Sequence, residues 1–372
     1  MSESTQRMDI QKLDRNMAVP QQGGSALKWL SPFLAPVEQL GFAWLEQDKK
    51  YRRLPVKPAV PLPPAVDVLA NCTAGGQIRF RTNSSRLSIR VRLRDPADMY
   101  HMAPTGQCGF DCYLGDPGAR YFLTTARLNP REREYEAAFY DWQRQQEEEV
   151  TLYFPLYQAV ESVWIGIDSD AELFSPAPLA SYKPVIIYGT SITQGGCASR
   201  PGMAYPNILS RQLPLPFINL GFSGNGKGEP ELAEVISTIE DPALLVLDYE
   251  ANVGTVEDMA RTFPEFIRIV RSNHPKLPIL AISNIEYAGI RFNREIAQLH
   301  EARRKVQMDT IQSLREAGDM HLHFVDGYCL LGEDASECTV DGVHPTDLGF
   351  WKMAQALHPI LLKILEPLIK TA

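Results

Sequence analysis

The chain has 372 residues, 44% of them hydrophobic, and a formal net charge of −8 at pH 7. This length favours two domains or one large domain. The acidic balance argues against binding to nucleic-acid backbones or anionic membranes, because both need clustered Lys and Arg. No run approaches the roughly 18 apolar residues that span a bilayer, and the polar N-terminus lacks the apolar stretch of a signal peptide. We therefore expect a soluble, cytoplasmic protein with no membrane or nucleic-acid partner.

The cysteines bear on metals and disulfides. No two of them have Cys-x-x-Cys spacing, so we expect no structural zinc, and we expect no cofactor either. A chain of this size does not need disulfides. Cys329 and Cys338 could pair, but free thiols are favoured. The six positions are Cys72, Cys108, Cys112, Cys197, Cys329 and Cys338.

The first half of the chain is predicted to be all-β. Residues 1–25 are typical of a disordered arm, and the proline-rich run Leu54–Val66 is predicted to lie extended over a surface. In RLSIRVRLR, Leu87 and Ile89 alternate with Ser88 and Arg90, which is the pattern of an antiparallel strand with one wet face. Similar short runs recur up to about residue 168. We predict a jelly-roll-like β-sandwich domain over 26–180.

The second half, 181–372, is predicted to be an α/β domain. Continuous apolar runs such as PVIIYG and ALLVLDY alternate with amphipathic helical patterns. This alternation indicates a parallel sheet covered on both faces, with about five strands in a doubly wound order. The last helix is predicted to start near Thr346 or Asp347, with Pro359 kinking or breaking it.

Polar residues follow several of these predicted strands. Ser191 follows the first, the loop Gly221–Gly228 the second and Asn252 the third, while Asp341 and His344 lie in a loop after the last. The carboxyl ends of parallel strands meet at one edge of a sheet, where ligands bind. His344 could activate Ser191 as a nucleophile, with Asp341 orienting the imidazole.

The loop after the second strand, GFSGNGKG, allows two interpretations. Its glycines and Lys227 have the spacing of a phosphate-binding loop, but Gly228 stands where such a loop needs Ser or Thr for magnesium. Alternatively, the backbone N–H groups of Gly224 and Ser191 and the side-chain amide of Asn252 form an oxyanion hole. This second interpretation is favoured, and it predicts that the Gly224 N–H faces the Ser191 hydroxyl.

Taken in order, GTSIT, INLGFSGN, EAN and DGVHP resemble the four blocks of the SGNH (GDSL-type) hydrolases, which are esterases, lipases and acyltransferases on a flavodoxin-like α/β fold. The resemblance implies that Ser191 is the nucleophile, that Asp341 and His344 complete the triad, and that Gly224 and Asn252 complete the oxyanion hole. The first half resembles the β-sandwich of one SGNH branch, whose G-x-D-L-Y marker appears as Gly109–Tyr113 with Cys in place of Leu.

The sequence departs from the family's blocks at two places, and the roles of several residues stay open. Thr190 stands where the family has aspartate, and Glu250-Ala251-Asn252-Val253 replaces the usual G-x-N-D. Glu250 could contact a substrate hydroxyl or cap a helix. The remaining candidates lie in the first half: Asp111 and Tyr113 could fix a turn of the sandwich or lean into the cleft to select substrate, and His101 could join them there.

These residues predict a serine ester hydrolase that removes a small acyl group, such as acetyl, from a sugar or another hydroxylated molecule. Its substrate would be a small-molecule or oligosaccharide ester. One alternative is an acyltransferase that passes the same acyl group to an alcohol. A third possibility is a carbohydrate-binding protein whose hydrolase domain is inactive.

Overall fold

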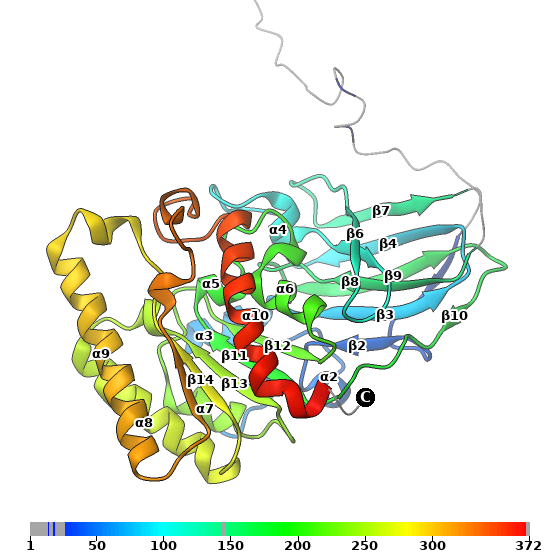
Figure 1. Ribbon diagram of the computed structural model, residues 1–372. Coiled ribbons are helices and arrows are strands. Elements are labelled where there is room, and N and C mark those ends of the chain that lie inside the picture. The colour runs from blue at the N-terminus through cyan, green and yellow to red at the C-terminus, as the bar shows by residue number, and fades with distance from the viewer. Residues whose placement is uncertain (1–13, 15–17, 19–26, 143–145, 370–372) are drawn as a thin grey trace, which may run out of the picture.

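In the computed structural model, which describes residues 14, 18, 27–142 and 146–369, an antiparallel β part and a parallel α/β part lie side by side (Figure 1). The predicted N-terminal arm therefore falls almost entirely outside the described residues. Among the helices of the described ranges, none is both long and apolar enough for a membrane crossing. All six cysteines are free thiols, which confirms the preference for an unpaired Cys329 and Cys338.

The antiparallel part consists of two facing sheets. In β4 (Arg86–Leu93), the alternate residues Leu87, Ile89, Val91 and Leu93 are at most 1% exposed, as their period of two predicts. They share one core with residues of the second sheet, such as Ile78 and Phe80. The first sheet has the order β1 (Lys28–Leu30), β9 (Val160–Ile167), β4, β7 (Glu134–Asp141). The second has the order β10 (Leu173–Phe174), β3 (Gln77–Thr82), β8 (Glu148–Tyr153), β5 (Asp111–Leu114), β6 (Tyr121–Thr125), with β2 (Glu38–Leu40) also paired to β3.

The α/β part contains the predicted five-stranded sheet, and every pairing in it is parallel. The spatial order is β12 (Phe217–Gly221), β11 (Val185–Gly189), β13 (Leu244–Asp248), β14 (Ile279–Ile282), β15 (Leu322–Val325). The first strand in the chain, β11, therefore lies between the second, β12, and the third, β13, so that the strand order reverses direction at β11. This is the flavodoxin-like arrangement, in which the crevice beside the reversal is where ligands bind.

Helices cover both faces of this sheet because its strands are apolar on both sides. Ile187 and Val246 belong to one core, with α6 (Tyr205–Gln212) and α10 (Asp347–Ile369). Tyr188 and Leu247 belong to the other, with α7 (Pro230–Ile236), α8 (Val256–Asn273) and α9 (Arg294–Glu316). The start predicted for the last helix agrees with α10, but Pro359 does not break it. Short helices are α2 (Leu45–Asp48), α4 (Pro104–Cys108), η2 (Pro201–Met203), η4 (Ala288–Arg291), η5 (Gly327–Cys329) and η6 (Ala335–Glu337).

The proline-rich segment differs from its prediction. Leu54 and Val66 are completely buried in the core beneath α7 and α8, so the segment does not lie on the surface along its whole length. It also ends in a helix, α3 (Pro64–Leu69), because a proline in the first helical turn has no N–H that the helix would need. Segment 51–76 thus packs largely with the α/β part, and the domain division at residue 180 stays a prediction.

Candidate active site

Ser191 lies at the point where the sheet order reverses. It follows β11 directly and is the first residue of the short helix α5 (Ser191–Gln194). Thr190, which stands where the resembling family has aspartate, caps this helix: its Oγ1 accepts a hydrogen bond of 3.3 Å from the N–H of Ile192. A hydroxyl oxygen can accept this bond as a carboxylate would, so the substitution preserves the turn.

Three side chains form a continuous hydrogen-bonded chain. Ser191 Oγ lies 2.9 Å from Nε2 of His344, and Nδ1 of His344 lies 2.7 Å from Oδ2 of Asp341. The other carboxylate oxygen, Oδ1, accepts the backbone N–H groups of His344 (2.8 Å) and Val343 (3.0 Å). Asp341 therefore fixes both the loop and the ring. With the proton on Nδ1 facing the carboxylate, Nε2 presents a lone pair to the serine hydroxyl.

The electrostatics of this chain keep Asp341 charged. Burial works to raise the pKa of Asp341, but the hydrogen bonds from the backbone and ring of His344 and from Val343 outweigh it and hold the pKa below its usual value. Ser191 is 8% exposed, so its hydroxyl is largely screened from bulk water. The arrangement can therefore stabilise an imidazolium at His344 while a proton leaves Ser191.

The two strands that flank β11 in the sheet, β12 and β13, bring the predicted oxyanion donors to the same edge. The loop with Gly224 follows β12 and is fixed by the bond from Ser223 N to Gln194 Oε1, 3.1 Å. Gly224 has a φ of +68°, a left-handed conformation that glycine adopts without strain. Asn252 ends the turn η3 (Glu250–Asn252) after β13, and its Nδ2 donates to the Phe222 carbonyl at 3.3 Å. The donor roles of Gly224 and Asn252 stay predictions.

Glu250 fits neither of the roles left open for it. Its side chain is turned into the protein: Oε2 accepts the Asn284 N–H at 3.0 Å and Gln307 Nε2 at 2.7 Å, and Oε1 lies 3.5 Å from Arg303 Nε. The residue is 2% exposed. A carboxylate committed to these partners neither caps a helix nor extends to a substrate hydroxyl.

Asp111 and Tyr113 hold a loop of the α/β part. Arg200 Nη1 donates to Asp111 Oδ2 at 2.8 Å and to the Tyr113 hydroxyl at 2.6 Å. The N–H of Gly202 adds a 2.7 Å bond to the same Asp111 oxygen. Asp111 is completely buried, and its carboxylate binds the loop after α5. The structure thus gives the motif a third role that was not predicted, which is to join the two parts of the molecule.

His101 does approach the catalytic chain. Its Nε2 lies 4.0 Å from Asp341 Oδ2, and its ring packs edge-on against His344 with centroids 5.7 Å apart. Among the described residues, one group could hold a metal: His101, Cys197 and His344 have ligand atoms within 4.8 Å of one another. Burial raises the pKa of the Cys197 thiol to about 12, so a metal would first have to displace its proton.

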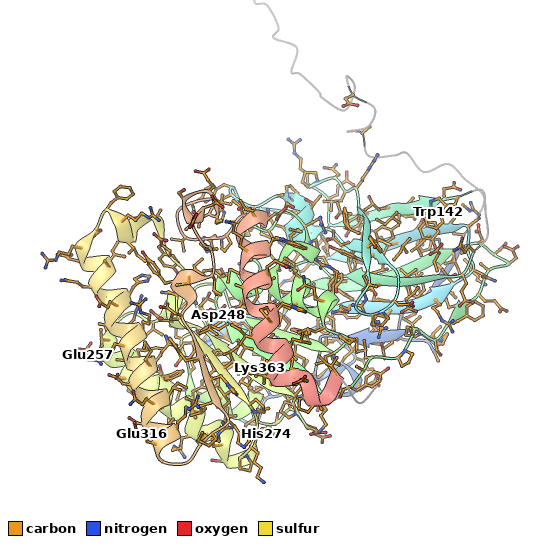
Figure 2. The ribbon with its side chains drawn as sticks, viewed as in Figure 1. Trp142, Asp248, Glu257, His274, Glu316 and Lys363 are labelled. Carbon is orange, nitrogen blue, oxygen red and sulfur yellow. The ribbon has the colours of Figure 1, made fainter. Side chains whose placement is uncertain are left out.

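Asp248 and Arg200 were missed because their roles depend on the fold. Asp248, which ends β13 (Figure 2), accepts hydrogen bonds from Thr193 Oγ1 (2.8 Å) and the Tyr205 hydroxyl (2.7 Å), and so ties α5 to the sheet. Arg200 bonds residues about 90 positions away. The role of Asp248 could have been suggested only by its position at the end of a strand. No local sequence signal indicates the role of Arg200.

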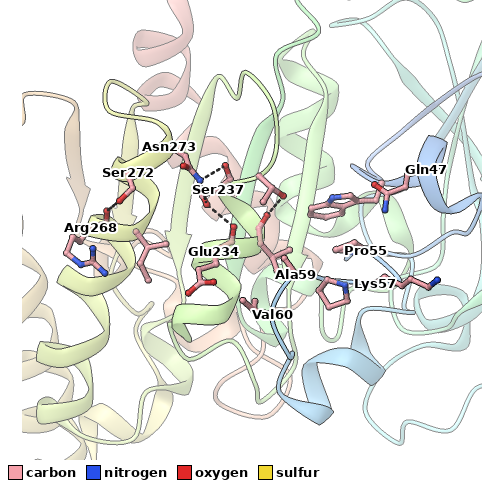
Figure 3. A pocket seen from close by; sticks show the side chains of 15 residues that line it. Gln47, Pro55, Lys57, Ala59, Val60, Glu234, Ser237, Arg268, Ser272 and Asn273 are labelled. Carbon is pink, nitrogen blue, oxygen red and sulfur yellow. Dashed lines mark hydrogen bonds between the residues drawn. The ribbon is translucent and has the colours of Figure 1, made fainter.

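A separate cavity has a volume of about 490 Å³ (Figure 3). Segment 44–60, with Trp44 and Pro55, forms one wall, and α7 and α8 form the other. Asn273 and Ser237 are joined across this second wall by a 2.8 Å hydrogen bond. None of the predicted site residues lines this cavity.

Comparison with known proteins agrees with this architecture. Residues 182–362 match the model of the GDSL-like lipase/acylhydrolase family, and residues 27–173 match that of the GxDLY N-terminal region of SGNH-hydrolase-type esterases. A protein of Bacteroides ovatus ATCC 8483, assigned as a GDSL-like lipase, is 31% identical with a TM-score of 0.84, over 91% of this chain and 98% of its own. The chain belongs to the GDSL-like lipase/acylhydrolase family of SGNH hydrolases, as its sequence blocks indicated.

More distant solved structures share the fold. The salicylyl-acyltransferase SsfX3 of a tetracycline biosynthetic pathway is 20% identical with a TM-score of 0.75, over 92% of this chain and 99% of its own. A family two carbohydrate esterase from Cellvibrio japonicus is 15% identical with a TM-score of 0.58, over 92% and 98%. The search of curated proteins returned no match. The two-part α/β fold with an antiparallel N-terminal part is therefore confirmed.

Proposed function

We propose that this protein is a serine esterase in which Ser191 is the nucleophile, His344 the general base and Asp341 the residue that orients the imidazole. The hydrogen-bonded chain of 2.9 Å and 2.7 Å through these three side chains is the observation that carries the proposal. The first length allows direct proton transfer from Ser191 to His344, and the second lets Asp341 orient the imidazole. The position of Ser191 at the reversal of the sheet order supports it.

In acylation, Ser191 Oγ attacks the ester carbonyl carbon while His344 Nε2 takes the hydroxyl proton. The carbonyl π electrons move to its oxygen, and this oxyanion is held by the N–H groups of Ser191 and Gly224 and by the amide of Asn252. The intermediate collapses, the C–O bond to the alcohol breaks, and His344 returns the proton to the leaving oxygen.

In deacylation, water takes the place of the alcohol. His344 removes a proton from the water as its oxygen attacks the acyl carbon, and the same donors hold the second oxyanion. Breakdown of this intermediate restores the Ser191 hydroxyl with the proton from His344 and releases the carboxylic acid. An alcohol that attacks instead of water would make the enzyme an acyltransferase.

For the substrate, we propose a small acyl group such as acetyl on a sugar or another hydroxylated molecule. Support comes from the carbohydrate esterases among the structures with the same fold. The fold also serves an acyltransferase, so transfer to an alcohol is the second candidate. Adding acceptor alcohols and measuring the ratio of new ester to free acid separates these two activities.

The central test is Ser191→Ala with p-nitrophenyl acetate. Turnover should fall by at least about 10⁴-fold, because the acyl-enzyme cannot form. Ser272→Ala is the matched control, because this exposed serine, whose hydroxyl donates to the Arg268 carbonyl within α8, is not one of the predicted site residues and its loss should leave turnover unchanged. Full turnover by Ser191→Ala, or failure of a fluorophosphonate probe to label Ser191, would refute the assignment.

A further inference from the structure

Side chains of α9 contact the turn η3, which carries Asn252. Arg303 Nη1 donates a hydrogen bond to the carbonyl of Val253, the residue that follows η3, while Arg303 Nε lies 3.5 Å from the Glu250 carboxylate at the start of η3. Gln307, one helical turn further along α9, donates to the same carboxylate at 2.7 Å. One guanidinium thus contacts the first residue of the turn and the residue that directly follows it.

This turn has little support of its own. Its internal hydrogen bonds are Asn252 N to the Tyr249 carbonyl, 3.1 Å, and Val253 N to the Glu250 carbonyl, 3.0 Å. A single turn of 3₁₀ helix has strained hydrogen-bond geometry and is marginal when isolated. The sequence here also lacks the glycine and the aspartate of the G-x-N-D block, and has Glu250 and Val253 in their places. The contacts from α9 reach these same two positions.

We propose that Arg303 and Glu250 are positioning residues, which clamp η3 against α9 and thereby aim the Asn252 amide at the oxyanion. The inference rests on the proposed function, since it assigns a role to Asn252 in ester hydrolysis. An oxyanion donor is effective only when it is fixed before the charge develops. Arg303 is suited to this because one rigid, planar guanidinium donates to the Val253 carbonyl and also lies beside the Glu250 carboxylate, whereas a lysine carries its charge on a flexible stem.

The burial of the pair supports a fixed geometry. Arg303 is 4% exposed, Glu250 is 2% exposed and Gln307 is 1% exposed. Burial raises the pKa of Glu250 to about 7, while the Asn284 N–H and the charge of Arg303 work in the opposite direction. Rotation of the turn away from α9 would leave the buried guanidinium and the buried carboxyl group without their partners, so it is disfavoured.

The experiment compares Arg303→Met with Arg304→Met in hydrolysis of p-nitrophenyl acetate. Arg304 is the next residue of α9, but it pairs with Asp326 at 3.0 Å instead of contacting η3. Arg303→Met should lower kcat by about 10- to 100-fold with KM changed less than about threefold, because only the transition state uses the donor. Arg304→Met should match the wild type, and Arg303→Lys should recover part of the loss.

A double-mutant cycle separates positioning from general damage. In an Asn252→Ala background, Arg303→Met should lower kcat by less than about twofold more, because the donor it positions is already gone. Since Arg303→Met leaves Glu250 buried and unpaired, Glu250→Gln/Arg303→Met is made as well. It should regain thermal stability but not kcat, because the Val253 carbonyl stays unheld.

Two outcomes would overturn the inference: an unchanged kcat in a folded Arg303 variant, or an equal loss with and without the Asn252 side chain. Failure of the proposed function looks different. In that case the wild type itself would show no turnover that depends on Ser191, so an effect of Arg303 on kcat could not be measured.

Discussion

Arg200 donates to the buried carboxylate of Asp111 at 2.8 Å, and this ion pair links the antiparallel part to the loop that follows the Ser191 helix. The guanidinium carbon also lies 3.6 Å from the centroid of the Phe122 ring. The same loop donates the Gly202 N–H to Asp111. The first half of the chain therefore supports the loop after α5 through a completely buried carboxylate.

Replacing Asp111 should destabilise the protein more than it impairs chemistry. Asp111→Ala leaves the Arg200 cation without its carboxylate partner and the Gly202 N–H without its acceptor, so we expect a loss of about 3–5 kcal/mol in the free energy of unfolding. Denaturant titration followed by fluorescence measures this loss. Asp116→Ala, which removes a carboxylate from the exposed turn after β5, is the control. A loss below about 1 kcal/mol would contradict the role of Asp111 as an anchor.

Gly224 and Gly318 give a matched pair for the oxyanion donor. Both have positive φ, +68° and +107°, and at both an added Cβ meets no atom within 4 Å. Alanine at either position should cost about 1–2 kcal/mol of stability from backbone strain. Only Gly224→Ala should also lower kcat, by about tenfold or more, because relaxation of the loop moves the N–H. Equal kcat values for the two variants would remove Gly224 from the site.

Asp341→Asn should abolish most of the activity without unfolding the loop. The amide oxygen can still accept backbone N–H groups, but the side-chain amide donates to Nδ1 and favours the wrong tautomer of His344. We expect kcat to fall by about 10⁴-fold. Steady-state kinetics measure the fall, and Asp309→Asn, a surface carboxylate paired with Lys305, is the control. A decrease of less than tenfold would show that Asp341 does not orient the base.

The stability of the protein should depend on pH through Asp248. Burial raises the pKa of Asp248 from 3.8 to about 6 in the folded state. The folded form therefore binds this proton more tightly than the unfolded form, so the stabilisation is complete below 3.8 and is lost as pH rises through about 6. Asp248→Asn removes this dependence. The melting temperature of the wild type should fall relative to that of the variant between about pH 4 and about pH 7, and a constant difference would contradict the assignment.

Periodicity and motif order were enough to predict both architectures. The alternation around Ile89 and the apolar runs ending at Gly189 and Asp248 depend on local sequence, and the structure confirms them. The residues predicted for catalysis also meet at one edge, since topology alone brings the ends of parallel strands together. Their catalytic roles stay predictions.

Long-range side-chain contacts could not be predicted. The sequence left Glu250 to contact a substrate hydroxyl or to cap a helix, yet its carboxylate turns toward Arg303, 53 residues later in the chain. Asp111 and Arg200 likewise meet only after two parts of the fold come together. Such pairs have no periodic signal, because their geometry depends on helix placement and burial. The proline-rich segment was misjudged because its composition did not show that Leu54 and Val66 would be buried.

The burial of Arg53 couples the unfolding of the two parts of the molecule. This completely buried side chain bonds the Gly221 carbonyl at the end of β12 and lies over the Phe222 ring at 4.7 Å. Strands β1 and β2 precede it and β3 follows it, so the polypeptide crosses between the two parts three times. We therefore expect that neither part folds alone as a contiguous module, and that melting follows one cooperative transition in calorimetry instead of two.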